Sequence, residues 1–205
     1  MRACEAVGII ALLLSAPASA KDTGRWALFS NARFGTIAEI PEGLFKAQQP
    51  PANGDGRTFR SEDGAEVRIY GNYNTEETFE AYKQWLWDLL PRERVQISYK
   101  TSGEHWQARS VSKDLLSRHV VTGGNWLAYS GYQGRNIVYR KQIEGCEALH
   151  TVSAVYPRAL KVKYDPVVSR IAGALRCEMP WDCRKGQKDC KSMVSEYNDG
   201  VVWPD

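Results

Sequence analysis

Serine, lysine and histidine are the residues of this chain whose types and spacing could support nucleophilic or acid–base chemistry. Ser110 and Lys113 have the S-x-x-K spacing in which a lysine activates a serine nucleophile. The companion motifs K-T-G and S-D-N do not occur, and Ser110 falls in a predicted strand or turn. His105, His119 and His150 lack the H-x-x-x-H and H-E-x-x-H spacings of metal sites. We therefore predict no catalytic residue, and keep as an alternative a periplasmic hydrolase built around Ser110 or His150.

The segment 53–56, with sequence Asn-Gly-Asp-Gly, imitates part of a calcium-binding loop together with Glu62. In that alignment the first ligand position is Pro51, which has no side-chain oxygen, and Pro50 before it opposes the entering helix. A glycine-rich turn before a strand is the simpler interpretation. The sequence contains no G-x-G-x-x-G motif and no Walker loop. We predict neither a metal nor a cofactor.

Aromatic residues are frequent, with seven Trp and ten Tyr. Several gather around a predicted hairpin at 126–139, and two Trp lie two positions apart in a predicted helix, so at least one must face away from its apolar stripe. Exposed aromatics anchor protein interfaces and stack on sugars, whereas a twisted sheet also favours buried aromatics. The candidate binding surface consists of Trp85, Trp87, Trp126, Tyr129, Tyr132 and Tyr139.

Four cysteines follow the amino-terminal segment that contains Cys4. An even number in an exported chain predicts two disulfides, for which three pairings are possible. We favour Cys146–Cys177 and Cys183–Cys190. The alternative is a zinc site with four thiolates, which normally uses C-x-x-C pairs that this chain lacks.

The first twenty residues have the pattern of a cleaved signal peptide. Arg2 precedes the apolar run 6–14, and the small residues 18–20 form a cleavage pattern before Lys21. The apolar run is shorter than the roughly 20 residues of a membrane span. We expect a periplasmic or secreted protein without a membrane span. The net charge of +3 is too small to indicate nucleic-acid binding.

Apolar and polar residues alternate with period two through most of the remaining chain, which predicts half-buried strands. The expected strands lie at 34–40, 66–70, 94–99, 106–109, 126–129, 137–139 and 152–156. Two segments have helical spacing instead. The first would begin at the N-cap Asn74, with Glu77 as capping-box partner, and end at Pro91. The second would have Asp165 as N-cap and Pro166 at its first position.

These elements predict an α+β fold with a largely antiparallel, twisted sheet of about six to eight strands, covered by two main helices. We expect a signal peptide at 1–20, a single domain at 21–177, and an irregular tail at 178–205 stapled by a disulfide.

The order of the parts resembles the PsbP-like fold, which the extrinsic P-subunit of photosystem II shares with a Ran-binding nuclear import factor. The residues that carry the resemblance are Asn31, Phe34, Gly35, Ile37, Ile40 and Pro41 at the opening, Phe45 after it, and Tyr156, Pro157, Tyr164, Asp165 and Ile171 at the close. The chain also resembles small exported alphaproteobacterial proteins that contain the segment 53–57, Asn-Gly-Asp-Gly-Arg.

The resemblance implies an adaptor or assembly role without catalysis. Together with the leader, it predicts a non-enzymatic, protein-binding domain of the cell envelope whose partner is another envelope or exported protein. Binding of a glycan or another small ligand is the alternative, and it would use the same aromatic residues.

Overall fold

The structure is a computed structural model, and it describes the backbone of residues 24–110, 118–180 and 201–202. Side chains are described for residues 24–104 and 124–178. The predicted signal peptide, the side chain of Ser110, Lys113, and both cysteines of the predicted Cys183–Cys190 disulfide lie outside these ranges.

The described chain forms eleven strands, two α-helices and a short 3₁₀ helix. The strands are β1 (Trp26–Asn31), β2 (Thr36–Pro41), β3 (Lys46–Ala47), β4 (Gly56–Arg60), β5 (Glu66–Asn72), β6 (Gln96–Ser110), β7 (Arg118–Gln133), β8 (Asn136–Gly145), β9 (Ala148–Pro157), β10 (Arg176–Pro180) and β11 (Val201–Val202). The helices are α1 (Phe79–Leu89), η1 (Arg158–Leu160) and α2 (Lys161–Gly173).

All strands join in one antiparallel sheet, with the order β11-β1-β2-β10-β7-β8-β9-β5-β4-β3 and with β6 along the other edge of β7. The long strand β7 organises this sheet because it pairs with β10 through residues 118–121 and with β8 through residues 126–133. The predicted α+β class and the antiparallel sheet are confirmed. The strand count exceeds the expectation partly because the two-residue strands β3 and β11 are too short for a periodic pattern.

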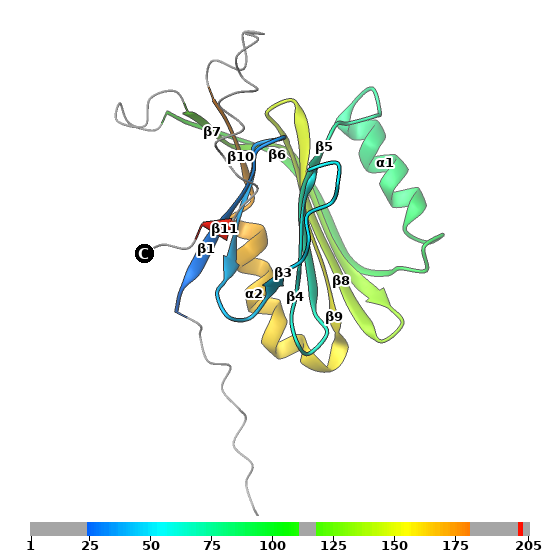
Figure 1. The fold of residues 1–205 in the computed structure, drawn as a ribbon. Coiled ribbons are helices and arrows are strands. Elements are labelled where there is room, and N and C mark those ends of the chain that lie inside the picture. The colour runs from blue at the N-terminus through cyan, green and yellow to red at the C-terminus, as the bar shows by residue number, and fades with distance from the viewer. Residues whose placement is uncertain (1–23, 111–117, 181–200, 203–205) are drawn as a thin grey trace, which may run out of the picture.

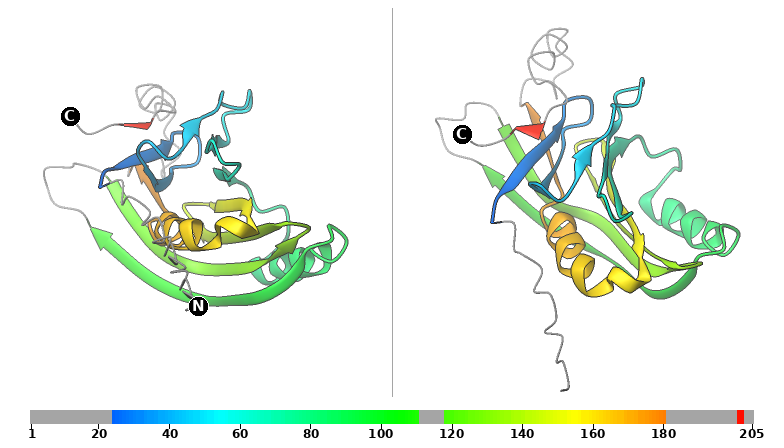
Figure 2. Two further views of the ribbon diagram at one scale, coloured as in Figure 1. Left: turned by 90° about the horizontal axis from the view of Figure 1, so that it is seen from below. Right: turned by 60° about the horizontal axis from the view of Figure 1, so that its bottom comes forward.

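The two helices cover opposite faces of the sheet (Figure 1). Figure 2 shows α2 inside the curve of the long strands. There it packs Tyr164, Val168 and Ile171 against apolar side chains of β1, β2, β4, β5, β8 and β9. On the other face, α1 packs its buried stripe of Phe79, Tyr82 and Leu86 against β7, β8 and β9. None of the described helices is long and apolar enough to cross a membrane.

The first helix begins later than the sequence pattern predicted. Its N-cap is Thr78, whose hydroxyl accepts a hydrogen bond from the backbone N–H of Ala81 at 3.1 Å. The side chain of Asn74 instead accepts a bond from the backbone N–H of Glu76, so Asn74 forms a local turn. The capping box from Asn74 to Glu77 was therefore a wrong prediction.

The second helix begins earlier than predicted, at Lys161, and Pro166 lies inside it. Tyr164, which is fully buried, packs against Phe45 and Tyr156 from within the first turn. Lys161 and Asp165 form an ion pair four residues apart in the same turn. Burial of Tyr164 extends the helix ahead of the proline, and Asp165 is not its N-cap.

The expected irregular tail at 178–205 contributes to the sheet where it is described. Residues 178–180 continue β10, which pairs with β7. Residues 201–202 form β11, which pairs with β1.

Candidate functional site

A pocket of about 330 Å³ opens on the face of the sheet that also carries α1, beside the segment before β4. Its walls come from residues 49–55, the first half of β4, and the facing residues of β5, β8 and β9. Gly56 opens β4 at the pocket wall. A Cβ atom there would lie 2.1 Å from the carbonyl oxygen of Ile69 and 2.5 Å from Cβ of Tyr70. Strand β4 can therefore lie this close to β5 only because residue 56 has no side chain.

The register of the sheet places two arginines on either side of a small residue. Arg68 of β5 is opposite Ser153 of β9, and Ser153 is opposite Arg140 of β8. Opposite residues of neighbouring strands point to the same face, and the three strands together span about 10 Å. The short side chain of Ser153 thus leaves a hollow between two guanidinium groups, and Arg57 of β4 also lines it.

Arg140 is only partly satisfied by hydrogen bonds in this pocket. Its Nη2 donates a hydrogen bond to the hydroxyl of Tyr70 at 3.0 Å. Its Nε is buried and has no hydrogen-bond partner. Within the described ranges no carboxylate lies within ion-pair distance of Arg140, whereas Arg68 pairs with Glu66 at 2.6 Å.

Arg140 keeps its charge despite its burial. Burial alone would lower its pKa, but the negative charges of ionised Tyr70, Tyr129 and Tyr82 and of the carboxylate of Glu93 hold the pKa above its usual value. Burial in turn raises the pKa of Tyr82 and of Tyr129, so both stay neutral at physiological pH. The pocket therefore contains a permanent cation that has no carboxylate within ion-pair distance in the described part of the chain, although the charge of Glu93 acts on it from further away.

The carboxylates near the pocket already form ion pairs with arginines. Asp55 accepts a hydrogen bond from Nη1 of Arg33 at 2.7 Å. Glu66 is shared between Arg60, at 2.8 Å, and Arg68. Arg140 adds a further cation at the same place, so the environment of the pocket is positive.

Such an arrangement can bind an anion, because guanidinium groups hold carboxylates and phosphates through paired N–H donors. The volume lies in the range of about 300–1,000 Å³ that is usual for ligand pockets. Sequence reasoning identified the segment 53–57 but not Arg68, Tyr70 or Arg140. The only available signal was that each of these polar side chains alternates with apolar residues in a predicted strand.

The six aromatic residues of the predicted binding surface lie on both faces of the sheet. Trp85, Trp87 and Tyr129 lie on the side of α1. Trp85 is 47% exposed, whereas Trp87 is half-buried against Tyr129 with ring centroids 5.9 Å apart. As the spacing in the helix predicted, one of the two Trp faces away from the core.

Trp126, Tyr132 and Tyr139 lie on the side of α2, packed against the larger core. Tyr132 and Tyr139 line a second pocket, of about 180 Å³, together with Tyr156 and Asp165. The hydroxyl of Tyr156 donates a hydrogen bond to Oδ1 of Asp165 at 2.8 Å. The six aromatics therefore form two separate groups and do not line one continuous surface.

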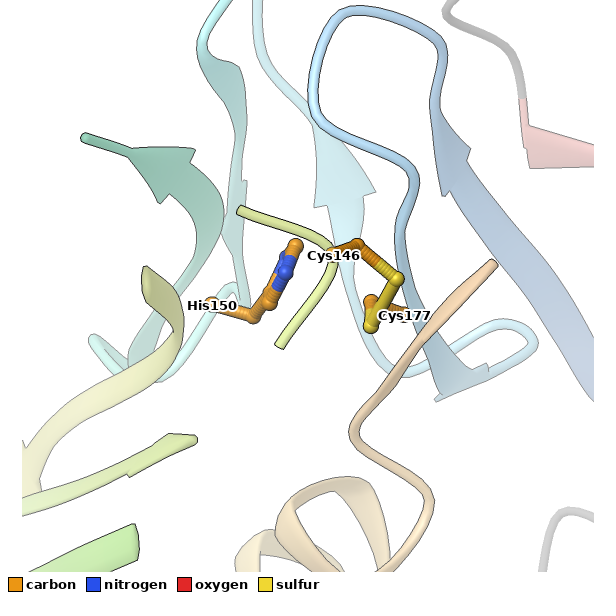
Figure 3. Close-up of side chains that lie close together, drawn as sticks. All are labelled: Cys146, His150 and Cys177. Carbon is orange, nitrogen blue, oxygen red and sulfur yellow. A yellow bond between two sulfur atoms is a disulfide. The ribbon is translucent and has the colours of Figure 1, made fainter. Parts of the chain in front are cut away.

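A disulfide joins Cys146 and Cys177, which confirms this half of the predicted pairing. His150 lies beside it (Figure 3), and the ligand atoms of all three residues are within 4.8 Å of one another. His150 is fully buried, and both ring nitrogens are bonded: Nε2 to the carbonyl of Gly145 at 2.9 Å and Nδ1 to Oγ1 of Thr36 at 2.7 Å. Burial lowers the pKa of His150 to about 4, although the bond to Gly145 works in the opposite direction.

The calcium interpretation of the segment 53–56 is not supported by the geometry. Glu62 lies beyond the far end of β4 and pairs with Lys46 at 2.8 Å. Asp55 precedes the other end of β4 and pairs with Arg33. The two carboxylates do not converge on a common point, and residues 53–56 form the turn that the simpler interpretation predicted.

The fold and the pocket define an α+β sandwich domain with a cationic pocket in its sheet. No family model and no curated protein matches the chain. Among solved structures, the chain is similar to cyanobacterial PsbP (CyanoP) from Synechocystis sp. PCC 6803, with a TM-score of 0.46 and 11% identity over 86% of this chain and 98% of that chain.

The chain is also similar to the Ran-binding protein Mog1p of Saccharomyces cerevisiae, with a TM-score of 0.41 and 8% identity over 78% of this chain and 97% of that chain. A mutant of the protein Mog1 gives a TM-score of 0.40 and 7% identity over 74% of this chain and 95% of that chain. These neighbours bear the names of the fold family that the sequence resembles. At such identities and TM-scores, the similarity says nothing about what this chain binds.

Proposed function

We propose that this protein is an exported, non-enzymatic binding domain of the cell envelope that receives an acidic group of a partner protein in the arginine-lined pocket. The observation that carries the proposal is Arg140, a half-buried arginine whose buried Nε lacks a partner and which has no carboxylate within ion-pair distance in the described chain. A buried charge without a counter-ion is costly to keep, and an incoming carboxylate removes that cost.

The sequence supports export through the leader pattern at 1–20 and the even number of cysteines after it. A non-enzymatic role agrees with the position of His150, which the sequence analysis had weighed as a catalytic base. Both of its ring nitrogens are engaged in the core, away from the 330 Å³ pocket. The alphaproteobacterial proteins that the chain resembles are also exported, which is consistent with an envelope location.

Site-directed cross-linking in the cell tests this proposal. A photo-reactive amino acid replaces Gln49, which is exposed at the rim of the pocket, and Gln133, which is exposed outside it, serves as the control position. We expect one dominant protein to be captured from position 49 and not from position 133. Capture should be lost with Arg140→Gln and retained with Arg135→Gln, which removes the charge of an exposed arginine outside the pocket. Capture from position 49 that persists in Arg140→Gln would overturn the proposal.

A glycan is the second candidate ligand, and the pocket lined by Tyr132, Tyr139, Tyr156 and Asp165 favours it. Aromatic rings can stack on a sugar while a carboxylate accepts bonds from its hydroxyl groups. Peptidoglycan fragments should then change the intrinsic fluorescence of the protein, and Tyr139→Ala should abolish the change. A flat response in the unmodified protein would exclude this candidate.

A further inference from the structure

Three side chains that can bind a soft metal converge where three strands meet. Cys146 lies in the two-residue turn between β8 and β9, where it and Glu147 both have positive φ, 47° and 63°. His150 is the third residue of β9, and Cys177 is the second residue of β10. Their two sulfur atoms and an imidazole nitrogen lie within 4.8 Å of one another (Figure 3).

The imidazole of His150 is oriented as a metal-binding imidazole usually is. The carbonyl oxygen of Gly145 can only accept a hydrogen bond, so Nε2 of His150 carries the proton. This leaves Nδ1 with its lone pair, which accepts a bond from the hydroxyl of Thr36. In metal sites, a histidine ligand commonly donates its other N–H to a backbone carbonyl, and that bond fixes the ring. Thr36 is also paired directly with Cys177 between β2 and β10, so this lone pair is held near the sulfur.

We propose that Cys146, His150 and Cys177 bind one Cu(I) ion when the disulfide between the two cysteines is reduced. A dithiol supplies the two electrons and two protons of the reduction: its thiolate attacks one sulfur, the S–S bond breaks, and the dithiol leaves as a disulfide. Two thiols form in the protein. Binding of the ion then releases the thiol protons, and Nδ1 exchanges the hydroxyl of Thr36 for the metal.

The number and chemistry of the donors favour Cu(I) over other ions. Thiolates select soft ions such as Cu(I) and zinc. A structural zinc site takes four ligands, whereas the described residues bring three such donors together here. Cys177 and His150 are both fully buried, so bulk water is not available as a fourth ligand. A dry site with two sulfurs and one nitrogen suits a three-coordinate monovalent ion.

The disulfide can be reached from one side. Cys146 is half-buried in its turn and Glu147 beside it is exposed, whereas Cys177 is fully buried. A reductant therefore attacks Cys146 first, and the buried thiolate of Cys177 leaves. The oxidised form, with both sulfurs in the disulfide, offers no thiolate to a metal.

A competition experiment tests the proposal on the full mature chain carrying Cys183→Ser and Cys190→Ser, so that only two cysteines are present. Under anaerobic conditions, the reduced and the oxidised proteins are each added to the Cu(I)–bicinchoninate complex. We expect the reduced protein to withdraw one equivalent of Cu(I) and the oxidised protein to withdraw none. Equal withdrawal by both forms, no withdrawal by either, or unfolding of the reduced chain in circular dichroism would overturn the proposal.

The variant His150→Gln removes the imidazole as a metal ligand but can keep the two hydrogen bonds that His150 makes in the fold. A glutamine amide can donate to Gly145 and accept from Thr36, but it is a poor ligand for Cu(I). Affinity should fall by at least about tenfold in this variant. Copper X-ray absorption on the protein with His150 intact gives a second readout that does not depend on folding of the variant. Scattering from two sulfurs and one nitrogen is expected, and coordination by sulfur alone would contradict the site.

Discussion

Arg140 donates a hydrogen bond to the hydroxyl of Tyr70, a residue 70 positions earlier in the chain, at 3.0 Å. The two residues lie on strands separated by β9, and both line the pocket. The hydroxyl of Tyr70 orients the guanidinium group of Arg140, and no carboxylate lies within ion-pair distance of that group in the described chain. The hydrogen bond between Arg140 and Tyr70 is the basis of the proposal that the pocket binds an anion.

Replacing Arg140 should cost little stability. Arg140→Leu removes a half-buried charge that has no carboxylate within ion-pair distance in the described chain, so we expect the free energy of unfolding to stay unchanged or to rise by about 1 kcal/mol. Gln142→Leu, on the same face of β8, is the matched control. Gln142 accepts a hydrogen bond from the buried hydroxyl of Tyr82 at 2.8 Å, and its loss should cost about 1–3 kcal/mol.

Urea unfolding of both variants checks this contrast. If Arg140→Leu loses as much unfolding free energy as Gln142→Leu, then Arg140 is a structural residue whose charge and donors are already compensated inside the folded protein.

Gly56 should tolerate no side chain. In Gly56→Ala the new Cβ would meet the backbone of β5, at Ile69 and Tyr70, which cannot yield as a flexible side chain can. We expect a loss of about 2 kcal/mol or more, because overpacking forces the backbone to shift. Gly173→Ala is the control, since a Cβ at this last residue of α2 meets no atom within 4 Å. It should be neutral or stabilising by up to about 1 kcal/mol. Melting temperatures that fall equally in both variants would contradict the close approach of β4 to β5.

His150 should make the protein less stable in mild acid. The folded state binds a proton at His150 only near a pKa of about 4, whereas the unfolded chain does so near 6.5. Because the unfolded state holds more protons between these values, stability falls as the pH falls from 6.5 to 4. The total loss is about 3 kcal/mol and should not grow at lower pH.

The unfolding free energies of the unmodified protein and of His150→Gln, measured across this range, isolate the effect from the titration of carboxylates. The difference between the two proteins should change between pH 6.5 and 4. A constant difference would show that His150 titrates normally.

The Cys146–Cys177 disulfide should be worth about 3–4 kcal/mol, because it closes a loop with a sequence separation of 31 residues. The double variant Cys146→Ser/Cys177→Ser is expected to lower the midpoint of urea unfolding accordingly. Peptide mapping of the exported, oxidised protein should recover Cys146 linked to Cys177. It also tests the predicted Cys183–Cys190 disulfide. A peptide joining Cys146 to Cys190 would contradict the pairing.

Local patterns in the sequence were sufficient for the fold class and for most strands. The Cys146–Cys177 disulfide was the favoured one of three possible pairings, and the structure confirms it. Val67 and Ile69 alternate with polar residues, and the structure buries both in the larger core. Helix starts were predicted less well, because several residues near a start can serve as caps. Asn74 and Thr78 both can, and the packing of Phe79 and Tyr82 on the sheet decides in favour of Thr78.

The pocket could not be predicted from the sequence. Arg68 and Arg140 lie on the same row of the sheet only because β9 is inserted between β5 and β8 and because Ser153 falls opposite both. Strand order and register follow from the whole sheet and are not encoded near either arginine. The segment 53–57, which has the partial calcium-loop pattern, contributes part of one wall of the pocket.

The most direct test of the pocket is to observe the Nε–H group of Arg140 while a triglutamate peptide is added to the purified mature protein. Nuclear magnetic resonance of arginine side chains resolves this group, which is buried and without an acceptor in the free protein. The proposed function predicts a saturable shift of the Arg140 Nε–H signal, with no shift for the exposed Arg135, and loss of the peptide interaction in Arg140→Gln. An Arg140 signal that stays unchanged at saturating peptide, or that moves in parallel with Arg135, would contradict the claim that this pocket binds acidic groups.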